Sequence, residues 1–431
     1  MFKKSVSCLF ILACSASAFA QFDQQQMSRG EYVAIAGNCA ACHTIEGGAA
    51  YAGGLKMAVP MLGRIYTTNI TPDPEHGIGG YTFEDFDAAM RDGIAKDGHY
   101  LYPAMPYPSY AKMTEEDMRA LYDYFMNEVQ PVAEPNLDAE IPGLLSFRWP
   151  LGVWNALFLD DEPYAGKTSE DDAWNRGAYL VQGLGHCGAC HSPRGMFMQE
   201  SGYDESSGEF LAGAELDHWS ASSLNGDINS GLGRWTVAET VEYLKTGKNR
   251  FSTAFGSMVE VINSSTQYLA DDDLYAIAVY LKSLPPWREQ GAEPYRYDPA
   301  ETERLRKMDF TTPGADIYYR ECIWCHMPDG SGLNKFQPTL AGNPAVLDPE
   351  PASTINVTLN GSLRLVVDGK PEPYDMPPMR ELLTDEEAAA VISYIRTSWG
   401  NKAAPVSAEE VAQMRASTDP VRNDIVVLQM Q

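Results

Sequence analysis

The sequence predicts an all-α protein in which three small helical domains follow one another along the chain. Three observations support this prediction. The pattern C-x-x-C-H occurs at 39–43, 187–191 and 322–326. Each copy follows a short helical segment and precedes a longer amphipathic segment with an acidic start. With 431 residues, the chain is also too long for one ordinary core.

Residues 1–20 have the features of an export signal. Two lysines precede an apolar stretch, and Ala-Phe-Ala at 18–20 forms a cleavage site of small residues. We therefore expect an exported chain that begins at Gln21; the alternative is a lipoprotein signal in which Cys14 is acylated. Outside this region, no segment approaches the ~20 apolar residues of a spanning helix.

The charge balance is strongly acidic. Removing the two lysines of the signal leaves 59 acidic residues against 30 basic ones, a net charge of −29. This balance argues against binding to nucleic acid and against electrostatic docking on anionic lipid. It would suit a basic protein partner, although solubility alone explains it equally well.

The C-x-x-C-H pattern is the attachment motif of haem c. Two thiolates add to the vinyl groups of the haem, and the adjacent His becomes the proximal iron ligand. No cysteine remains outside the motifs and the signal, so a four-ligand zinc site lacks partners. A redox dithiol would not require a His after the second Cys three times. Three covalent haems c are therefore expected, on Cys39, Cys42 and His43, on Cys187, Cys190 and His191, and on Cys322, Cys325 and His326.

Each domain is expected to begin with a short helix that runs into its haem motif. Residues 29–43 closely parallel residues 176–191, and residues 314–326 form a looser third copy. Two loops further along also match, because 69–82 and 225–236 share an Asn start and a Gly-x-Gly-x-aromatic-Thr end. These parallels indicate that one helical unit is repeated.

Each domain is expected to end with an amphipathic helix whose acidic residue lies seven positions before a Tyr. These helices are predicted at 113–125, 269–281 and 383–395, with Asp117, Asp273 and Glu387 as the acidic residues. Thr114 and Thr384 are predicted to open capping boxes, and Asp271 is predicted to cap the middle helix.

Proline-rich connectors at 130–143 and 284–299 mark the domain boundaries. The predicted organisation is a signal at 1–20, domain one at 21–143, an apolar and acidic connector at 144–170, domain two at 171–285, a linker at 286–307, domain three at 308–403 and a C-terminal tail at 404–431. The stretch 148–159 is unusually apolar for a linker. Packing across a domain interface is the preferred interpretation, and a surface that docks a partner is the alternative.

The sixth iron ligand is expected in a stiff loop before each C-terminal helix. Domain one offers Met105 in "LYPAMPYPSY", domain two offers Met258, and domain three offers Met376 or Met379. Met376 is preferred because a proline follows it, as a proline follows Met105. A thioether stabilises ferrous iron and raises the potential. Four histidines compete for these positions, but none recurs at the same place: His76, His99, His186 and His218.

Taken together, these motifs resemble the tri-haem cytochrome c subunit of membrane-bound alcohol, gluconate and related sugar or polyol dehydrogenases. The likeness runs nearly end to end and includes "LYPAMPYPSY", "GHCGACHSPRG" and "GRWTVAETVEYLKTG". It implies three class I-like cytochrome c domains with the haem residues and methionine ligands named above. The third domain departs most from the family pattern, because Met379 stands where the family often has an aromatic residue.

The resemblance also implies a function. A separate dehydrogenase subunit, carrying pyrroloquinoline quinone or FAD, would oxidise a CH–OH donor. This chain would then pass the electrons to ubiquinone at the periplasmic face of the bacterial inner membrane. No dinucleotide-binding turn is present, so the isolated chain is not expected to oxidise the substrate. Two alternatives remain: a multihaem oxidoreductase with its own catalytic haem, and a soluble periplasmic electron shuttle.

Overall fold

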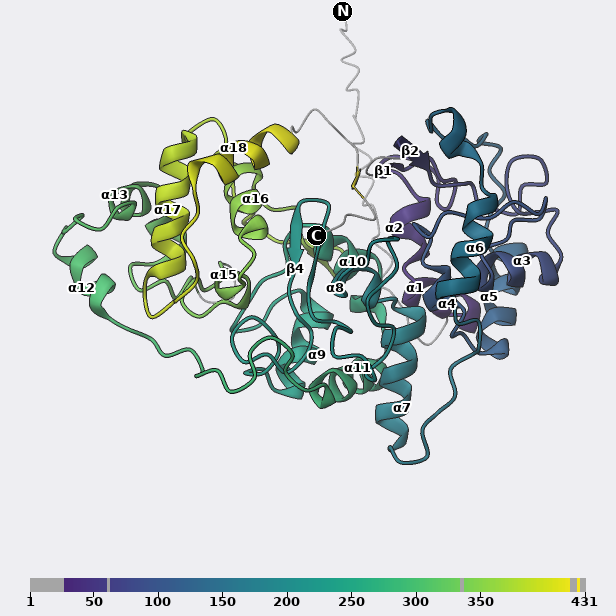
Figure 1. The fold of residues 1–431 in the computed structure, drawn as a ribbon, viewed down its shortest axis with the longest axis horizontal. Helices are drawn as coiled ribbons and strands as arrows, with labels where there is room; N and C mark the ends of the chain where they lie inside the picture. The colour runs from purple at the N-terminus through teal and green to yellow at the C-terminus, as the bar shows by residue number, and fades with distance from the viewer. Residues whose placement is uncertain (1–26, 60–62, 334–336, 419–424, 427–431) are drawn as a thin grey trace, which may run out of the picture.

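The computed structural model describes residues 27–59, 63–333, 337–418 and 425–426. Its helices gather into three bodies along the chain, with the second body between the first and the third (Figure 1). The prediction of a mostly helical protein is confirmed, and the strands of the described residues form only three small sheets. No helix of the described residues is long and apolar enough to cross a membrane. The expected signal lies outside the described residues.

The first body surrounds the motif at 39–43 and carries a two-stranded hairpin, whose first strand also pairs in parallel with β7 (Ile425–Val426). Its elements are α1 (Arg29–Ala36), α2 (Cys39–His43), β1 (Lys56–Val59), β2 (Gly63–Tyr66), α3 (Phe83–Arg91), α4 (Tyr107–Tyr110) and α5 (Glu115–Asn127). The expected connector adds η2 (Gly143–Ser146) and α6 (Trp149–Phe158).

The second body repeats this order around the motif at 187–191. Its elements are α7 (Asp172–Tyr179), the π-helical turn η3 (Leu180–Leu184), α8 (Gly188–His191), β3 (Ala214–Leu216), β4 (Trp219–Ala221), α9 (Val237–Thr246), α10 (Ser257–Ser264), η4 (Thr266–Tyr268) and α11 (Asp271–Ser283).

The third body surrounds the motif at 322–326 and extends beyond the repeated unit at both ends. Its elements are α12 (Ala300–Arg306), α13 (Ala315–Ile317), η5 (Tyr318–Cys322), α14 (Ile323–His326), α15 (Pro344–Leu347), α16 (Ala352–Asn360), β5 (Val366–Val367), β6 (Lys370–Pro371), α17 (Asp385–Thr397) and α18 (Ala408–Ser417). Leu305 of α12 and Val411 of α18 are buried in its core, although 286–307 was expected as a linker and 404–431 as a tail.

A glycine lets the first helix cross the last helix closely in every domain. A side chain on Gly30, Gly177 or Gly314 would collide with a backbone carbonyl of the crossing helix, which belongs to Ala120, Ala276 or Ala390. The glycine therefore keeps the two helices in backbone contact, and in the first two domains Tyr124 and Tyr280 pack beside the crossing.

The predicted caps are confirmed in part. Thr384 and Glu387 form a full capping box at α17, and the Thr114 side chain accepts from the Asp117 N–H at α5. The prediction for Asp271 is wrong, because Ala270 is the N-cap residue of α11 and Asp271 lies in its first turn. The three acidic residues in the first turn of α11 stabilise the partial positive charge at the N-terminus of the helix, although no side chain caps it.

Domains one and two meet through reciprocal contacts. Tyr32 of α1 donates to Asp273 of α11 at 2.6 Å, and Tyr179 of α7 donates to Asp117 of α5 at 2.5 Å. The backbone contacts are reciprocal as well, since the two hydroxyls accept from the N–H of Ala270 and of Thr114, at 3.2 and 3.4 Å. The two tyrosines occupy the same position in the repeated Arg-Gly-x-Tyr sequence. The two domains therefore face each other with an approximate twofold relation.

Domain three joins domain two through other elements. The Ser353 hydroxyl of α16 accepts from the Ser220 N–H of β4 at 2.9 Å and donates to the Ser220 carbonyl at 3.0 Å. The segment that leads into the β5–β6 hairpin lies on α10, where Leu365 is buried against Val259 and Ile262. The third domain thus completes part of the core of the second.

Candidate haem sites

Each C-x-x-C-H motif lies on a short helical turn. The residue before the first motif Cys, Asn38 or His186, has a positive φ in the first two domains, which turns the chain sharply into the haem loop. None of the six motif cysteines forms a disulfide. Burial raises the pKa of Cys42 and of Cys190 to about 11, because it disfavours the charged thiolate.

The three motif histidines are held in the same way. Nδ1 of His43 lies 2.6 Å from the Thr68 carbonyl oxygen, Nδ1 of His191 lies 2.7 Å from that of Ser222, and Nδ1 of His326 lies 3.1 Å from that of Pro338. Because a carbonyl only accepts, each imidazole donates from Nδ1 and keeps the Nε2 lone pair free.

This arrangement suits an iron ligand. Burial lowers the pKa of all three histidines, which keeps the rings neutral. A neutral imidazole whose Nδ1–H is bonded to a carbonyl is the usual form of a metal-ligating His, because the bond fixes the ring orientation. The donor set of two cysteines and one oriented histidine therefore fits haem c in every domain.

The three carbonyl partners were not predicted. They follow their histidines by 25, 31 and 12 residues, and a backbone carbonyl has no side chain that could mark it in a sequence. Only the docking of the loop beside each motif brings the carbonyl to the ring.

Met105 lies partly buried against the core of domain one, which also contacts Cys39. Two tyrosines that follow Met105 anchor its loop. Tyr107 is fully buried and donates to the Asn155 side chain at 2.7 Å, and Tyr110 donates to the Gly37 carbonyl at 2.8 Å. The proline-rich loop is therefore held stiffly next to the haem motif.

The other methionine candidates have different surroundings. Met258 lies in the first turn of α10, against the small core that also receives Leu365. Met376 exchanges two hydrogen bonds with Ser362, from backbone to side chain at 3.0 Å and from backbone to backbone at 3.1 Å. Met379 packs against the domain-three core that Cys322 also contacts. Both third-domain methionines therefore lie in one loop, and the preference for Met376 stays a prediction.

The side chains of His99 and His186 have partners of their own. His99 is exposed and pairs with Asp97, with Nδ1 2.5 Å from the carboxylate. Nε2 of His186 lies 3.3 Å from the Gly37 carbonyl, and its ring meets Tyr110 edge-on. His218 lies in the turn between β3 and β4, and His76 lies in the loop after β2. The described residues hold no cluster of three His, Cys, Asp or Glu side chains for a separate metal ion.

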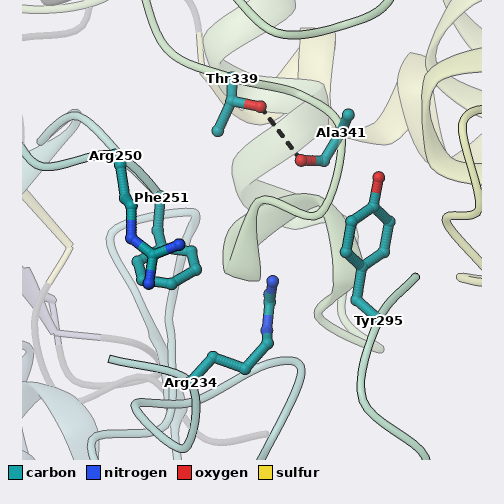
Figure 2. Close-up of a pocket in the computed structure, with 6 residues that line it drawn as sticks. All are labelled: Arg234, Arg250, Phe251, Tyr295, Thr339 and Ala341. Carbon is teal, nitrogen blue, oxygen red and sulfur yellow. Dashed lines mark hydrogen bonds between the residues drawn. The ribbon is translucent and has the colours of Figure 1, made fainter. Parts of the chain in front are cut away.

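A cationic cavity of about 480 Å³ lies between domains two and three (Figure 2). Arg234 and Arg250 lie on one side of it, and Thr339 and Ala341 line the other, next to the Pro338 carbonyl that binds His326. Arg234 reaches across and donates to the Gly342 carbonyl at 2.6 Å. Two guanidinium groups in one cavity suit carboxylates, the only acidic groups of a haem.

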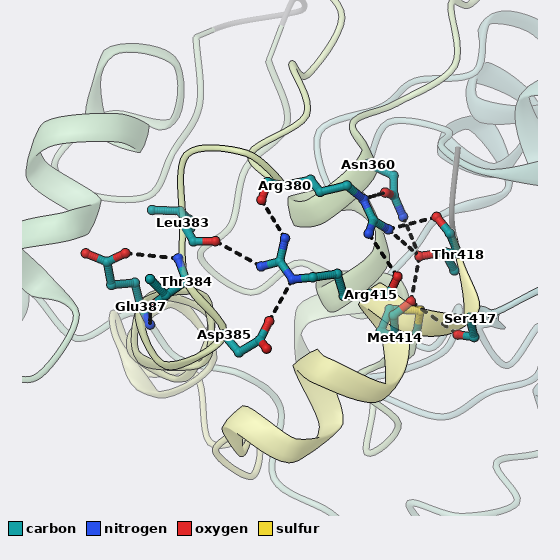
Figure 3. A network of polar contacts seen from close by, with 10 residues as sticks. All are labelled: Asn360, Arg380, Leu383, Thr384, Asp385, Glu387, Met414, Arg415, Ser417 and Thr418. Atoms are coloured by element: carbon teal, nitrogen blue, oxygen red, sulfur yellow. Dashed lines mark hydrogen bonds and ion pairs between the residues drawn. The ribbon is translucent and has the colours of Figure 1, made fainter. Parts of the chain in front are cut away.

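A network of arginines holds the methionine loop of domain three against α18 (Figure 3). Arg380 donates to the Asn360 side chain at 2.9 Å and to the Thr418 carbonyl at 2.7 Å. Arg415 of α18 donates to Asp385 at 2.7 Å and to the Leu383 carbonyl at 2.9 Å. The loop that carries Met376 and Met379 is therefore fixed by α18, which has no equivalent contact among the described residues of the first two domains.

The family described as "Cytochrome c" matches residues 27–128 and 311–399. The cytochrome c subunit of a quinone alcohol dehydrogenase from Gluconacetobacter polyoxogenes is 47% identical over 93% of this chain and 86% of its own length. The gluconate 2-dehydrogenase cytochrome c subunit of Pantoea cypripedii is 45% identical over 96% of this chain and 95% of its own. The fructose dehydrogenase cytochrome subunit of Gluconobacter japonicus is 40% identical over 90% of this chain and 82% of its own length.

These relatives cover the second domain as well as the segments that the family description matches. With its three oriented histidines and paired cysteines, the chain therefore belongs to the cytochrome c subunits of alcohol, gluconate and fructose dehydrogenases.

Proposed function

We propose that this chain passes electrons from a dehydrogenase subunit, through three haems c, to ubiquinone at the periplasmic face of the bacterial inner membrane. The observation that carries the proposal is the threefold arrangement of a Cys pair and a neutral His whose Nδ1–H is bonded to a carbonyl. The relatives are named as cytochrome subunits of alcohol, gluconate and fructose dehydrogenases, which supports a partner that oxidises a CH–OH donor. The cofactor of that partner, pyrroloquinoline quinone or FAD, follows from the family resemblance alone.

The chain's own residues hold and shield the cofactors. When bound, haem c supplies one-electron redox chemistry. Cys39 and Cys42, Cys187 and Cys190, and Cys322 and Cys325 attach the three groups. His43, His191 and His326 would be the iron ligands from the motifs, and Met105, Met258 and Met376 would supply the thioether ligands. Rigid cores around these residues keep structural change small when the charge of the iron changes.

Contacts between the domains support an electron path in which domain two lies between domain one and domain three. Nε2 of His186, next to Cys187, lies 3.3 Å from the carbonyl oxygen of Gly37, two residues before Cys39, so the attachment loops of domains one and two lie close together. The cavity with Arg234 connects domain two to the loop beside His326. Domain two therefore lies between the other two haem sites, and the relay passes through it.

A pull-down from membranes in mild detergent tests this function. The expected result is that a dehydrogenase subunit purifies with the chain and that the complex reduces ubiquinone when a CH–OH donor is added. The purified chain alone should oxidise none of these donors with an artificial acceptor. Donor oxidation by the chain alone, or a complex that never reduces ubiquinone, would contradict the proposal.

A further inference from the structure

The exposed face of α6 is apolar along its whole length. Trp149, Val153 and Leu157 follow one another at helical spacing and are 69%, 53% and 68% exposed. Pro150 and Ala156, on the same face, are exposed as well. A helix on a protein surface normally presents charged or polar residues to water. The ten residues of α6 include no ionisable side chain, although the chain carries a net charge of −27.

The opposite face of α6 is fixed to domain one. Asn155 accepts from Tyr107 at 2.7 Å and donates to the Asp92 carbonyl at 2.7 Å. A side chain on Gly152 would collide with the Tyr100 ring, so the helix backbone lies against that ring. One face of α6 is therefore packed on domain one, and the apolar stripe on the other face is held outward by this attachment.

A second segment extends this apolar surface. Trp154 donates to the Phe197 carbonyl at 2.8 Å, which holds the loop after α8 beside the helix. Phe197 is 62% exposed and its neighbour Met196 is 82% exposed. Phe147, before α6, is exposed as well. We call this surface, formed by Phe147, Trp149, Val153, Leu157, Met196 and Phe197, the α6 patch.

We propose that the α6 patch lies in the surface of a phospholipid bilayer, with α6 parallel to the membrane plane. This inference rests on the proposed function, which places the chain at a membrane, and it names the surface that makes the contact. The occupant is argued from charge and polarity. A protein partner would be expected to supply about one hydrogen bond per 100–200 Å² of interface. The side chains of the patch offer only one polar group, the Trp149 indole N–H.

Hydrocarbon matches such a surface because it needs no polar partners. Aromatic side chains such as Trp and Phe prefer the boundary between hydrocarbon and headgroups, and one indole N–H can reach the headgroups there. Rigid attachment also lowers the entropic cost of insertion, because α6 is already folded. An uncharged patch on an acidic chain should bind neutral lipid, and its binding should depend little on salt.

Co-sedimentation of the purified holo-protein with phosphatidylcholine vesicles tests the proposal, with haem absorbance as the readout. The wild type should sediment with the vesicles equally at low and high salt. Trp149→Glu/Leu157→Glu should weaken vesicle binding at least tenfold, and the neutral pair Trp149→Ser/Leu157→Ser should also weaken it. Tyr275→Glu/Met308→Glu, which charges two exposed apolar residues outside the patch, should bind as the wild type does.

The haem spectrum of each variant reports whether it is folded, and the serine pair serves if the glutamate pair fails to fold. Absence of wild-type binding to neutral vesicles, or equal binding by both patch variants, would overturn the proposal. If the patch variants no longer co-purified with the dehydrogenase subunit in detergent, the patch would be a protein-binding surface and the proposal would be wrong. Ubiquinone reduction in detergent tests the proposed function separately, since it needs no bilayer.

Discussion

Domains one and two meet through a reciprocal pair of tyrosine–aspartate contacts, whereas domain three joins domain two through α16 on β4 and through Leu365 on α10. Tyr32 of domain one donates to Asp273 of domain two, and Tyr179 of domain two donates to Asp117 of domain one. Because the two repeats carry the same Arg-Gly-x-Tyr sequence, one set of residues can form both halves of the contact, as in a symmetric dimer. The third copy lacks this sequence before its motif.

Domain three has contacts that replace the missing tyrosine–aspartate pair. It places Leu365 in the core of domain two and uses α18 to hold its methionine loop. The difference indicates that repetition of a fold does not fix how the copies join. The contact depends on a few surface residues, and these can be tested one by one.

The acidic residue at the start of the last helix has the largest expected effect. In domain two, Asp273 receives Arg176 at 2.7 Å and Tyr32 at 2.6 Å. Burial alone would raise the pKa of Asp273, but these hydrogen bonds lower it, so the residue is charged. Asp273→Ala leaves both partners unpaired and should reduce the free energy of unfolding by about 3 kcal/mol.

The equivalent residue of domain three only closes a capping box, so Glu387→Ala should cost about 1 kcal/mol. Denaturant unfolding of both variants measures the difference. Glu116→Ala, which removes an exposed partner of Arg29, is a control and should change stability by less than about 0.5 kcal/mol. Equal losses for Asp273→Ala and Glu387→Ala would show that the reciprocal contact adds no stability.

Glu200 should make domain two sensitive to pH. A side chain on Gly188, between the haem cysteines, would collide with its carboxylate, so this group lies against the attachment loop. Burial raises the pKa of Glu200 to about 7, although Arg194 opposes the shift. The folded protein then holds this proton more tightly than the unfolded chain does. The contribution to stability is fully present below about pH 4.5 and is lost as pH rises toward 7.

The total loss over this range should be about 3 kcal/mol, from ~1.4 kcal/mol per pKa unit. Glu200→Gln should flatten this part of the stability profile, as measured by thermal unfolding between pH 4.5 and 8. Asp204→Asn, which removes an acidic group from the same loop, is the comparison variant. A variant with an unchanged profile would place the titration elsewhere.

Leu365 tests whether domain three supports the second haem site. It is buried among Ala254, Val259 and Ile262, next to Met258. Leu365→Ala should cost about 2–3 kcal/mol through the cavity that it leaves. It should also lower the potential of the second haem, because water gains access to the methionine side. Leu363→Ala, two residues away and exposed, should leave both the stability and the potential unchanged. A loss of stability confined to domain three would contradict this role.

The repeated helical units could be predicted from the sequence, because each is marked by characteristic side chains at matching positions. The cysteine pairs, the histidines and the acidic helix starts recur at matching positions and could be found by comparison within one chain. The Nδ1 partners at Thr68, Ser222 and Pro338 could not be found, because any residue provides a carbonyl. Tyr32 and Tyr179 were visible as repeated residues, but their exchange between domains depends on docking that no local pattern encodes.

The methionine loop of domain three gives the smallest expected effect and the finest test of the comparison. If Met376 binds iron as Met105 is proposed to do, Met376→Ala should lower the potential of the third haem by on the order of 100 mV, because axial ligands set much of the range of haem potentials. Met379 packs on the core that Cys322 contacts, so Met379→Ala should cost about 2 kcal/mol of stability with little change in potential. Redox titration of both variants, with absorbance of the methionine–iron bond, separates the two roles. The opposite pattern would identify Met379 as the iron ligand. The arginine network around Arg380 would then position Met379, and the parallel between Met105-Pro106 and Met376-Pro377 would have indicated the wrong methionine.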